Sequence, residues 1–317
     1  QTAATLEIDS AQKTDSYPRT DTDATVMLDG HAFDLSRQYD SLNAAVNGLL
    51  GYGWRMPLLD FNLQSNIAPV PGQNSNFIPA FSDGTRLYLT LPDGSRVGFT
   101  FQPTKQEING QDYYTPTWVS DTGVNWTLQS AGNLLLQKAG SRYYDLGTGT
   151  AYNPQQIPPA SGAAFLLTGP DGTVYSESFA TGTSTLTTSQ VQFSDGVIWY
   201  VGDSGVVASN GQAIQFVTNA SGQLAQTILP DGSHYAYAYD STGNLVSAVD
   251  LSDDSADRYG YNPAAAHQLT TATGGLGQSG DAIEYGGSAP QVTPLTGNLG
   301  VALQYLSQSY SGTLLPG

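Results

Sequence analysis

The stretch LPDGSHYAYAYDSTGNLVSAVD, residues 229–250, decides the fold class, because turn signals alternate in it with strand-forming residues. Asp231-Gly232 suits a tight hairpin turn, since Gly accepts positive φ and Asp tolerates it. Three tyrosines then recur at every second position, which is the period of a strand with one buried face. The Gly of a second turn, Gly243, precedes another apolar run. The stretch therefore predicts consecutive β-hairpins.

The same turn phrase recurs along the chain, and strand-forming residues follow each copy. Asp-Gly stands at Asp83, Asp93, Asp171, Asp195 and Asp231. A complementary phrase, Gly followed by a polar residue and Leu, recurs at residues 132–134, 222–224 and 243–245. The interval between copies drifts, so we expect linked hairpins rather than a strict solenoid. A short helix over residues 41–50, capped by Gly48, is the one helix that we expect.

Composition and charge exclude some classes of binding partner and leave others compatible. Charged residues make up 12% of the chain, against about 25% in a typical globular domain. The formal net charge of −17 repels phosphate, so nucleic acid and anionic membranes are disfavoured, whereas divalent cations and neutral sugars stay compatible. Cysteine is absent, which excludes disulfides and thiolate chemistry. No apolar run approaches the roughly 18 residues of a membrane span, so no membrane insertion is expected.

Two segments together resemble the RHS family of YD-repeat proteins. Residues 235–250 carry alternating aromatics, then Tyr-Asp, two residues, Gly, one residue and Leu. Residues 259–262 resemble the next repeat, although Asn262 replaces Asp and Leu269 follows two residues late. Residues 35–41 and 48–54 resemble the segment that opens many RHS proteins. The resemblance implies sheets of linked hairpins that spiral into a shell, inside large exported bacterial proteins.

We therefore expect an all-β fold of linked antiparallel hairpins in a curved or spiralling, shell-like sheet, with a sandwich-like unit around residues 85–200 as an option. The expected organisation is an extended lead-in at 1–24, an N-terminal β domain at 25–205, YD-repeat hairpins at 206–275 and a strand-and-turn tail at 276–317. The composition and the resemblance predict an extracellular or cell-surface location, and the chain end suggests the front piece of a larger protein.

No catalytic centre is recognisable in the sequence. The three histidines lack metal-pair spacing, and no Gly-x-Ser-x-Gly elbow is present. A glycosidase would need two carboxylates on one cleft, and the candidates Glu107, Glu177, Glu284 and Asp145 carry no recognisable context. The interpretation is a non-enzyme, with a polysaccharide-acting enzyme as the least favoured alternative.

Two groups of residues are candidates for binding. Exposed aromatic rings can stack on sugars, and Trp118 and Trp126 flank an expected turn, with Tyr113 and Tyr114 nearby; core packing is the competing interpretation. The densest acid cluster could offer calcium several oxygen ligands, and a solvated connection between repeats is the competing interpretation. Its members are Asp250, Asp253, Asp254 and Asp257; residues Asp15, Asp21 and Asp23 form a weaker group. Calcium is the only cofactor that the sequence suggests.

The function that follows is a non-catalytic extracellular structural or adhesive module of a large RHS-like protein. Such a module would present a β surface to other domains of the same protein, to identical chains or to glycans. The alternative is part of a toxin-encapsulating shell, because some RHS shells hold a toxin. The self-cleavage motif that closes such shells is not visible here, which argues against a complete toxin-delivering module.

Overall fold

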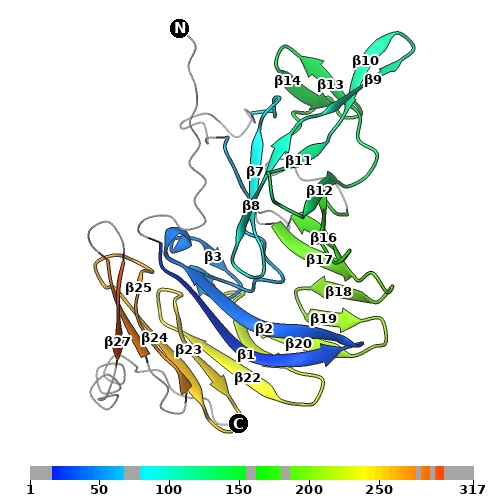
Figure 1. Cartoon of the computed structure of the whole chain (residues 1–317). Coiled ribbons are helices and arrows are strands. Elements are labelled where there is room, and N and C mark those ends of the chain that lie inside the picture. Colours follow the sequence, from blue (N-terminus) through cyan, green and yellow to red (C-terminus); the bar gives the residue numbers. More distant parts are fainter. Residues whose placement is uncertain are drawn as a thin grey trace. The chain divides into compact units, whose positions relative to one another are not determined.

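The computed structural model describes residues 16–67, 79–154, 162–179, 186–275, 280–285 and 290–295. These residues form strands β1 to β27 and a 3-10 turn at Ser41–Asn43, with no α-helix among them (Figure 1). The all-β, antiparallel prediction is confirmed. No helix in this part of the chain has the length and apolar character needed to cross a bilayer.

Contacts divide the chain into two units. Unit 1 comprises Gln1–Val26, Ala32–Met56 and Ile214–Gly317, and unit 2 comprises Met27–His31 and Pro57–Ala213. The expected domain boundaries at residues 24, 205 and 275 stay predictions. Residues 1–15 of the lead-in and residues 296–317 of the tail lie outside the described residues.

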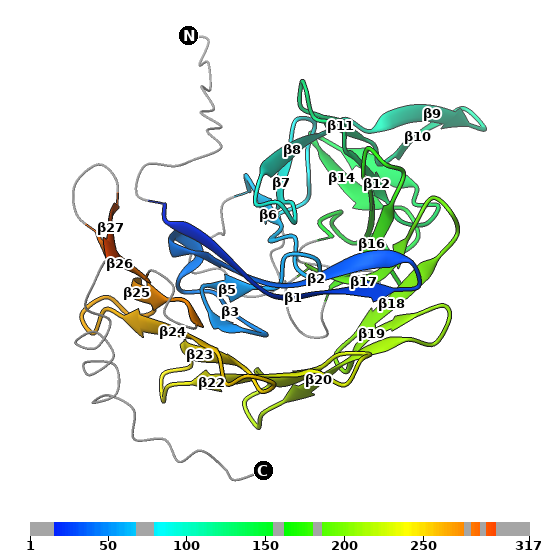
Figure 2. The ribbon, with the colours of Figure 1, turned by 60° about the horizontal axis from the view of Figure 1, so that its bottom comes forward.

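Unit 1 combines an N-terminal hairpin with a run of consecutive hairpins. The N-terminal strands are β1 (Pro18–Leu28), β2 (His31–Asp40), β3 (Asn47–Gly48), β4 (Gly51–Tyr52) and β5 (Trp54–Arg55). The later strands are β20 (Ala213–Thr218), β21 (Leu224–Ile228), β22 (His234–Tyr239), β23 (Leu245–Asp250), β24 (Ala256–Tyr261), β25 (Leu269–Thr273), β26 (Gly280–Glu284) and β27 (Gln291–Leu295). From β20 onward each strand pairs with the next along the chain, in an open sheet (Figure 2). This order is that of linked hairpins.

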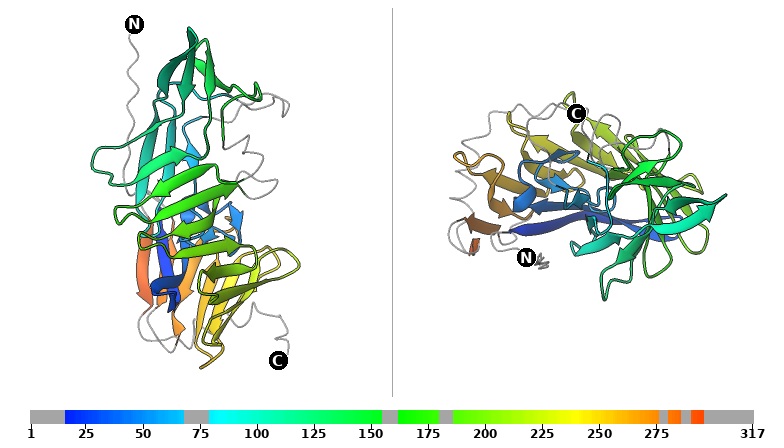
Figure 3. Two further views of the ribbon diagram at one scale, coloured as in Figure 1. Left: turned by 90° about the vertical axis from the view of Figure 1, so that its right-hand side faces the viewer. Right: turned by 90° about the horizontal axis from the view of Figure 1, so that it is seen from above.

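Unit 2 contains three sheets or parts of sheets. The strands β11 (Trp118–Ser120), β8 (Arg96–Phe101), β7 (Arg86–Thr90) and β6 (Gln64–Ser65) form one, in that order. The strands β14 (Arg142–Asp145), β13 (Leu136–Ala139), β10 (Gln111–Thr115) and β9 (Thr104–Ile108) form another. The third runs through β12 (Thr127–Ser130), β15 (Phe165–Thr168), β16 (Val174–Phe179), β17 (Leu186–Gln192), β18 (Ile198–Gly202) and β19 (Gly205–Ala208), whose green strands lie side by side in Figure 3.

Most of the recurrent turns share one geometry; the Asp83–Gly84 copy differs, because its Gly84 amide donates to the Phe101 carbonyl at 3.0 Å. In the turn between β21 and β22, the Leu229 amide donates to the Ser233 carbonyl (2.9 Å), and the Gly232 amide donates to the Leu229 carbonyl (3.0 Å). The same pair of bonds begins at residues 91, 169, 193, 208, 219 and 240. This is the three-residue hairpin loop that ends in a left-handed Gly, and Gly232 has φ +87°.

The role expected for Asp in these turns was wrong in one respect. Asp231 does not adopt positive φ, and its side chain instead accepts the amide hydrogen of Ser233 at 2.9 Å. Asp171 and Asp195 accept from Thr173 (3.0 Å) and Val197 (3.1 Å) in the same way. Asp therefore fixes the turn by side-chain hydrogen bonding, and only Gly supplies the left-handed residue.

The helix expected over residues 41–50 is also wrong. A 3-10 turn covers only Ser41–Asn43, and the Asp40 side chain caps it by accepting from the Leu42 amide at 2.9 Å. The chain then forms the β3–β4 hairpin, in which Gly48 pairs with Gly51. Tertiary contacts of this hairpin, described below, override the local helical preference.

Candidate functional site

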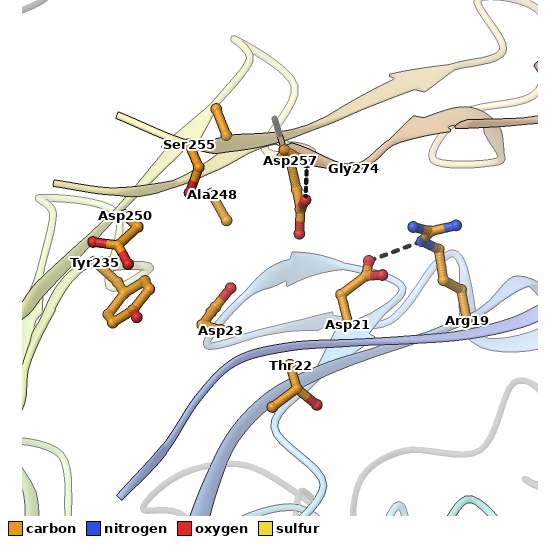
Figure 4. A pocket seen from close by; sticks show the side chains of 12 residues that line it. Arg19, Asp21, Thr22, Asp23, Tyr235, Ala248, Asp250, Ser255, Asp257 and Gly274 are labelled. Carbon is orange, nitrogen blue, oxygen red and sulfur yellow. Dashed lines mark hydrogen bonds and ion pairs between the residues drawn. The ribbon is translucent and has the colours of Figure 1, made fainter. Parts of the chain in front are cut away.

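A pocket of about 340 Å³ lies in unit 1, between strand β1 and the hairpins that follow β21 (Figure 4). Its lining comes from β1, β22, β23, β24 and the end of β25. The lining residues are Arg19, Asp21, Thr22, Asp23, Tyr235, Ala248, Asp250, Ser255, Ala256, Asp257, Gly274 and Gly275. Polar side chains dominate this lining, so the pocket is suited to polar or charged groups.

The alternation of β1 brings its charged residues to one face. Arg19, Asp21 and Asp23 occupy every second position, and a strand turns such positions to the same side. Thr22 lies between them in sequence, and its hydroxyl is 2.8 Å from the Ser36 hydroxyl on β2. The strand period therefore explains why two carboxylates from β1 reach the pocket.

Arg37 on β2 is the centre of the adjoining charge network. Its side chain is 0% exposed, and it forms a bidentate ion pair with Asp23 at 2.6 and 3.0 Å. It also donates to Asp257 at 2.8 Å and to the Tyr259 hydroxyl. Burial acts to lower the pKa of Arg37, but Tyr259 and Asp23 outweigh burial and raise it, so the guanidinium stays charged.

Tyrosine hydroxyls from the repeats complete this network. Tyr237 donates to Asp23 at 2.8 Å, and Tyr259 donates to Asp21 at 2.7 Å. Burial raises the pKa of both tyrosines well above the ordinary value, which keeps them neutral donors. Burial likewise raises the pKa of Asp23, although Arg37 and Tyr237 oppose it. Each hydroxyl of this set therefore satisfies a carboxylate that would otherwise be buried at high cost.

The network carries an excess of negative charge. Arg19 pairs with Asp21 at 2.8 Å and with Asp281 at 3.0 Å. Arg19 and Arg37 thus pair with four carboxylates, those of Asp21, Asp23, Asp257 and Asp281, and Asp250 adds a fifth carboxylate to the pocket lining. A cationic group would suit this charge balance. Among the residues that the structure describes, no group of three or more His, Asp or Glu has metal-binding geometry.

Next to this network, the segment 49–54 contacts successive repeats. The Leu49 carbonyl accepts from the Leu224 amide at 2.8 Å. The Tyr52 ring stacks on His267 with centroids 3.6 Å apart. The indole nitrogen of Trp54 donates to the Tyr261 hydroxyl at 2.8 Å. These contacts reach the β20–β21 and β24–β25 hairpins, and the Tyr52 amide donates to the Gly243 carbonyl of the β22–β23 hairpin between them at 3.4 Å.

Glycine is required where this segment approaches the repeats most closely. Gly51 has φ +82°, and a Cβ there would lie 2.5 Å from the Gly243 carbonyl oxygen. The backbone of the opening segment therefore lies directly on a repeat turn, with no room for a side chain.

The repeats are also joined to one another by a recurring hydrogen bond. The Tyr239 hydroxyl donates to the Leu224 carbonyl at 2.7 Å, and the Tyr261 hydroxyl donates to the Leu245 carbonyl at 2.8 Å. Tyr239 is the Tyr of the Tyr-Asp pair, and the two leucines end the Gly-x-Leu turns. A register shift precedes the tyrosine in both cases. Successive sequence repeats therefore form equivalent hydrogen bonds between a tyrosine hydroxyl and a leucine carbonyl.

The aromatic residues expected to bind sugars lie in unit 2. Trp118 is 9% exposed within the apolar core, and its indole nitrogen donates to the Ser130 hydroxyl at 3.1 Å. Trp126 packs against this core, and its ring centroid is 5.8 Å from that of Tyr175. Tyr113 and Tyr114 are half-buried neighbours on β10. Trp118 is thus part of the buried core. Ligand binding by these four residues stays a prediction.

The four acids expected to bind calcium are only partly brought together. Asp250 and Asp257 line the pocket, and Asp250 accepts from the Ser252 amide at 2.8 Å. Asp253 accepts from the Ser255 amide at 2.9 Å, and Asp254 adopts φ +58°. Each of the three hydrogen-bonded carboxylates thus has a partner within the protein, and calcium binding stays a prediction.

The carboxylates considered for a glycosidase are dispersed. Glu107 and Glu284 are exposed on β9 and β26, whereas Glu177 is fully buried on β16. Asp145 holds its own turn by accepting from the Thr148 amide at 2.7 Å.

Arg37 is the residue that sequence reasoning missed. The signal was that Arg37 shares one face of its strand with Leu35 and Tyr39, since a charged residue on a buried face requires a buried partner.

Comparison with known proteins identifies one segment. The family model described as RHS Repeat matches residues 219–255, which run from the turn at Asn219 through β21, β22 and β23 to Ser255. No curated protein matches the chain. The matched segment contains Tyr235, Tyr237 and Asp250 and thus supplies part of the pocket and of its charge network.

Proposed function

The chain carries an RHS repeat, which assigns it to the RHS/YD-repeat family, and from that premise we propose that it is a structural and adhesive module of a large extracellular RHS-like protein. In this role it presents a β surface to protein chains or glycans. Repeats of this family occur in extracellular and cell-surface bacterial proteins, and they are generally structural rather than catalytic.

The observation that carries the structural part is the junction around Arg37. The guanidinium joins β2 to the repeat strand β24 through Asp257, and the tyrosines of β22 and β24 bind the carboxylates of β1. The polar groups of the network are thus engaged with one another. This supports a role in which the N-terminal hairpin fixes the start of the repeat sheet.

An exposed row on unit 2 supports the adhesive part. Tyr200 on β18 and Val207 on β19 are cross-strand partners, and they are 54% and 46% exposed. Gln190 on β17 pairs with Tyr200 on its other side. A tyrosine ring between an amide and an aliphatic side chain offers an apolar face with polar neighbours, which suits a sugar or another protein surface.

Binding experiments with matched variants test this proposal. The chain is titrated against neutral polysaccharides and, by sedimentation, against itself. Tyr200→Ser is expected to weaken the contact at least tenfold, whereas Val119→Ser, on a 47% exposed valine of β11 outside the row, should leave it unchanged. Binding that is absent for every probe, or equally strong in Tyr200→Ser, contradicts the adhesive role.

The toxin-encapsulating shell is the second candidate, and it is compatible with the same RHS match. The gene around this segment separates the two. A self-cleavage motif followed by a variable C-terminal domain supports the shell, and its absence supports adhesion.

A further inference from the structure

Glu177, in unit 2, is a buried carboxyl group outside the site described above. It lies on β16 at a shift of register, and its side chain is 0% exposed. Its Oε1 is 2.9 Å from the Thr188 hydroxyl oxygen. Its Oε2 has no hydrogen-bond partner within the described part of the chain. A charged carboxylate in this position would be strongly disfavoured, because nothing compensates one of its oxygens.

The hydrogen count around Thr188 indicates the form that Glu177 adopts. The Thr188 hydroxyl oxygen is 2.9 Å from Glu177 Oε1 and 3.0 Å from the carbonyl oxygen of Leu58. A hydroxyl has a single hydrogen to donate, and both a carboxylate and a carbonyl only accept. If Glu177 is a carboxylic acid, it donates to Thr188, and Thr188 donates to Leu58. Both short distances are then satisfied.

The bond to Leu58 is one of the contacts that hold residues 57–60 on β17, whereas Phe61 is fixed separately, because its carbonyl accepts from the Thr90 amide of β7 at 2.7 Å. The Thr188 amide donates to the Leu59 carbonyl at 2.9 Å. The Phe61 ring lies edge-on to Tyr175, with centroids 5.3 Å apart. Ionisation of Glu177 would draw the Thr188 hydrogen to the carboxylate and leave the Leu58 carbonyl without it. The protonation state of Glu177 is therefore coupled to the attachment of this segment.

The surroundings of Glu177 favour the protonated form. Burial raises its pKa to about 8, the Thr188 hydrogen bond acts in the opposite direction, and the negative charge of Asp60 adds to the effect of burial. Asp60 belongs to the attached segment, and Tyr175 is the titratable neighbour on β16. Attachment of residues 57–60 thus brings a second carboxylate towards Glu177, which further favours the protonated form of Glu177.

We propose that Glu177 is a proton-dependent latch, which in its carboxylic acid form holds residues 57–60 on β17 through Thr188 and releases them when the proton is lost. Release exposes Glu177 to water, where its pKa returns to about 4.5. Between pH 4.5 and 8 the open state therefore binds one proton fewer than the closed state. The opening equilibrium rises about tenfold per pH unit in this window and is constant above it.

Hydrogen exchange on the full chain tests the latch. The protection factor of the Thr188 amide, corrected for intrinsic exchange, is measured from pH 5 to pH 8. In the wild type it should fall about tenfold per pH unit. In Glu177→Gln, which keeps a donor but does not titrate, it should be independent of pH. Glu107→Gln, on an exposed strand, should retain the wild-type slope.

Two results would overturn the proposal. One is an equal slope in the wild type and Glu177→Gln. The other is an equal fall at the Leu224 amide of unit 1, because the latch acts locally. Infrared spectroscopy gives an independent test if the variant folds poorly: the wild type at pH 6 must show the carbonyl band of a protonated buried carboxyl that deuterium exchange does not rapidly shift, and its absence refutes the latch.

Discussion

The two units stabilise their interiors by different means. The interior of unit 1 contains a fully buried arginine with its carboxylates and tyrosine hydroxyls. The interior of unit 2 is an apolar cluster in which Phe81, Phe101 and Trp118 contact one another edge-on or tilted, with centroids 5.1 to 5.9 Å apart. The first depends on directional pairing, and the second depends mainly on buried area.

The comparison explains why tyrosine is the repeated residue of unit 1. Its ring packs like that of phenylalanine, while its hydroxyl reaches a defined acceptor on a neighbouring hairpin. Tyr239 and Tyr261 reach carbonyls, whereas Tyr237 and Tyr259 reach carboxylates. Adjacent hairpins are thus fixed in register by specific bonds, which a purely apolar sheet face would not provide.

The largest effect is expected from Arg37→Met. The substitution keeps an unbranched apolar chain but leaves Asp23 buried without its partner, which costs about 3–5 kcal/mol when one member of a buried pair is removed. Urea unfolding at pH 7 measures the loss. Arg37→Met combined with Asp23→Asn should recover part of it, because the one charge that then lacks its arginine, Asp257, is partly exposed to water. Equal losses in the single and double variants would contradict the paired network.

A cavity in unit 2 should cost somewhat less and respond differently. Leu87 is 0% exposed in the apolar cluster, and Leu87→Ala should destabilise the protein by about 3 kcal/mol. Because no charge is involved, this loss should be the same at pH 6 and pH 8 and at low and high salt. A loss that changes with salt would show that unit 2 is not held by apolar packing.

The repeat region could be predicted from sequence because its signals are local. The turn at Asp240–Asn244 is held by bonds within five residues, and the tyrosines of β22 follow the period of a strand. Each of these patterns lies within one hairpin, so a short window contains all the information needed.

The charge network could not be predicted in the same way. Arg37 and Asp257 are 220 residues apart, and nothing next to either residue specifies the other. The helix expected over residues 41–50 failed for the same reason. The β3–β4 hairpin that replaces it depends on contacts with distant repeats, such as Tyr52 with His267. Local preference decides a segment only where no long-range contact competes with it.

The recurring bond of the repeats gives a smaller, matched pair of effects. Tyr239→Phe and Tyr261→Phe each keep the ring and remove one hydrogen bond to a carbonyl, so each should cost about 1 kcal/mol. Tyr200→Phe, on a 54% exposed ring, should change stability by less than about 0.5 kcal/mol. Urea unfolding of the three variants compares them directly. A cost for only one of the repeat tyrosines would show that the two repeats are not equivalent.

Calcium should have the smallest effect, if the acids at 250–257 bind it. Asp257 already neutralises Arg37, and the Asp250 carboxylate already accepts from Ser252, so a bound ion would compete with these bonds. A weak extracellular site has a Kd of about 0.1–1 mM. At about 1 mM calcium such a site adds about 0.4–1.4 kcal/mol by mass action.

For a chain of 317 residues this is a rise in Tm of about 2 °C or less, which chelator should reverse in the wild type. Asp253→Asn combined with Asp254→Asn should abolish the rise. Because these two side chains lie outside the pocket lining, the double variant leaves the Arg37 network intact and isolates the ion's contribution. A wild-type Tm that is equal with calcium and with chelator would contradict calcium binding by these acids. Their carboxylates would then act only in the turns and ion pairs of unit 1.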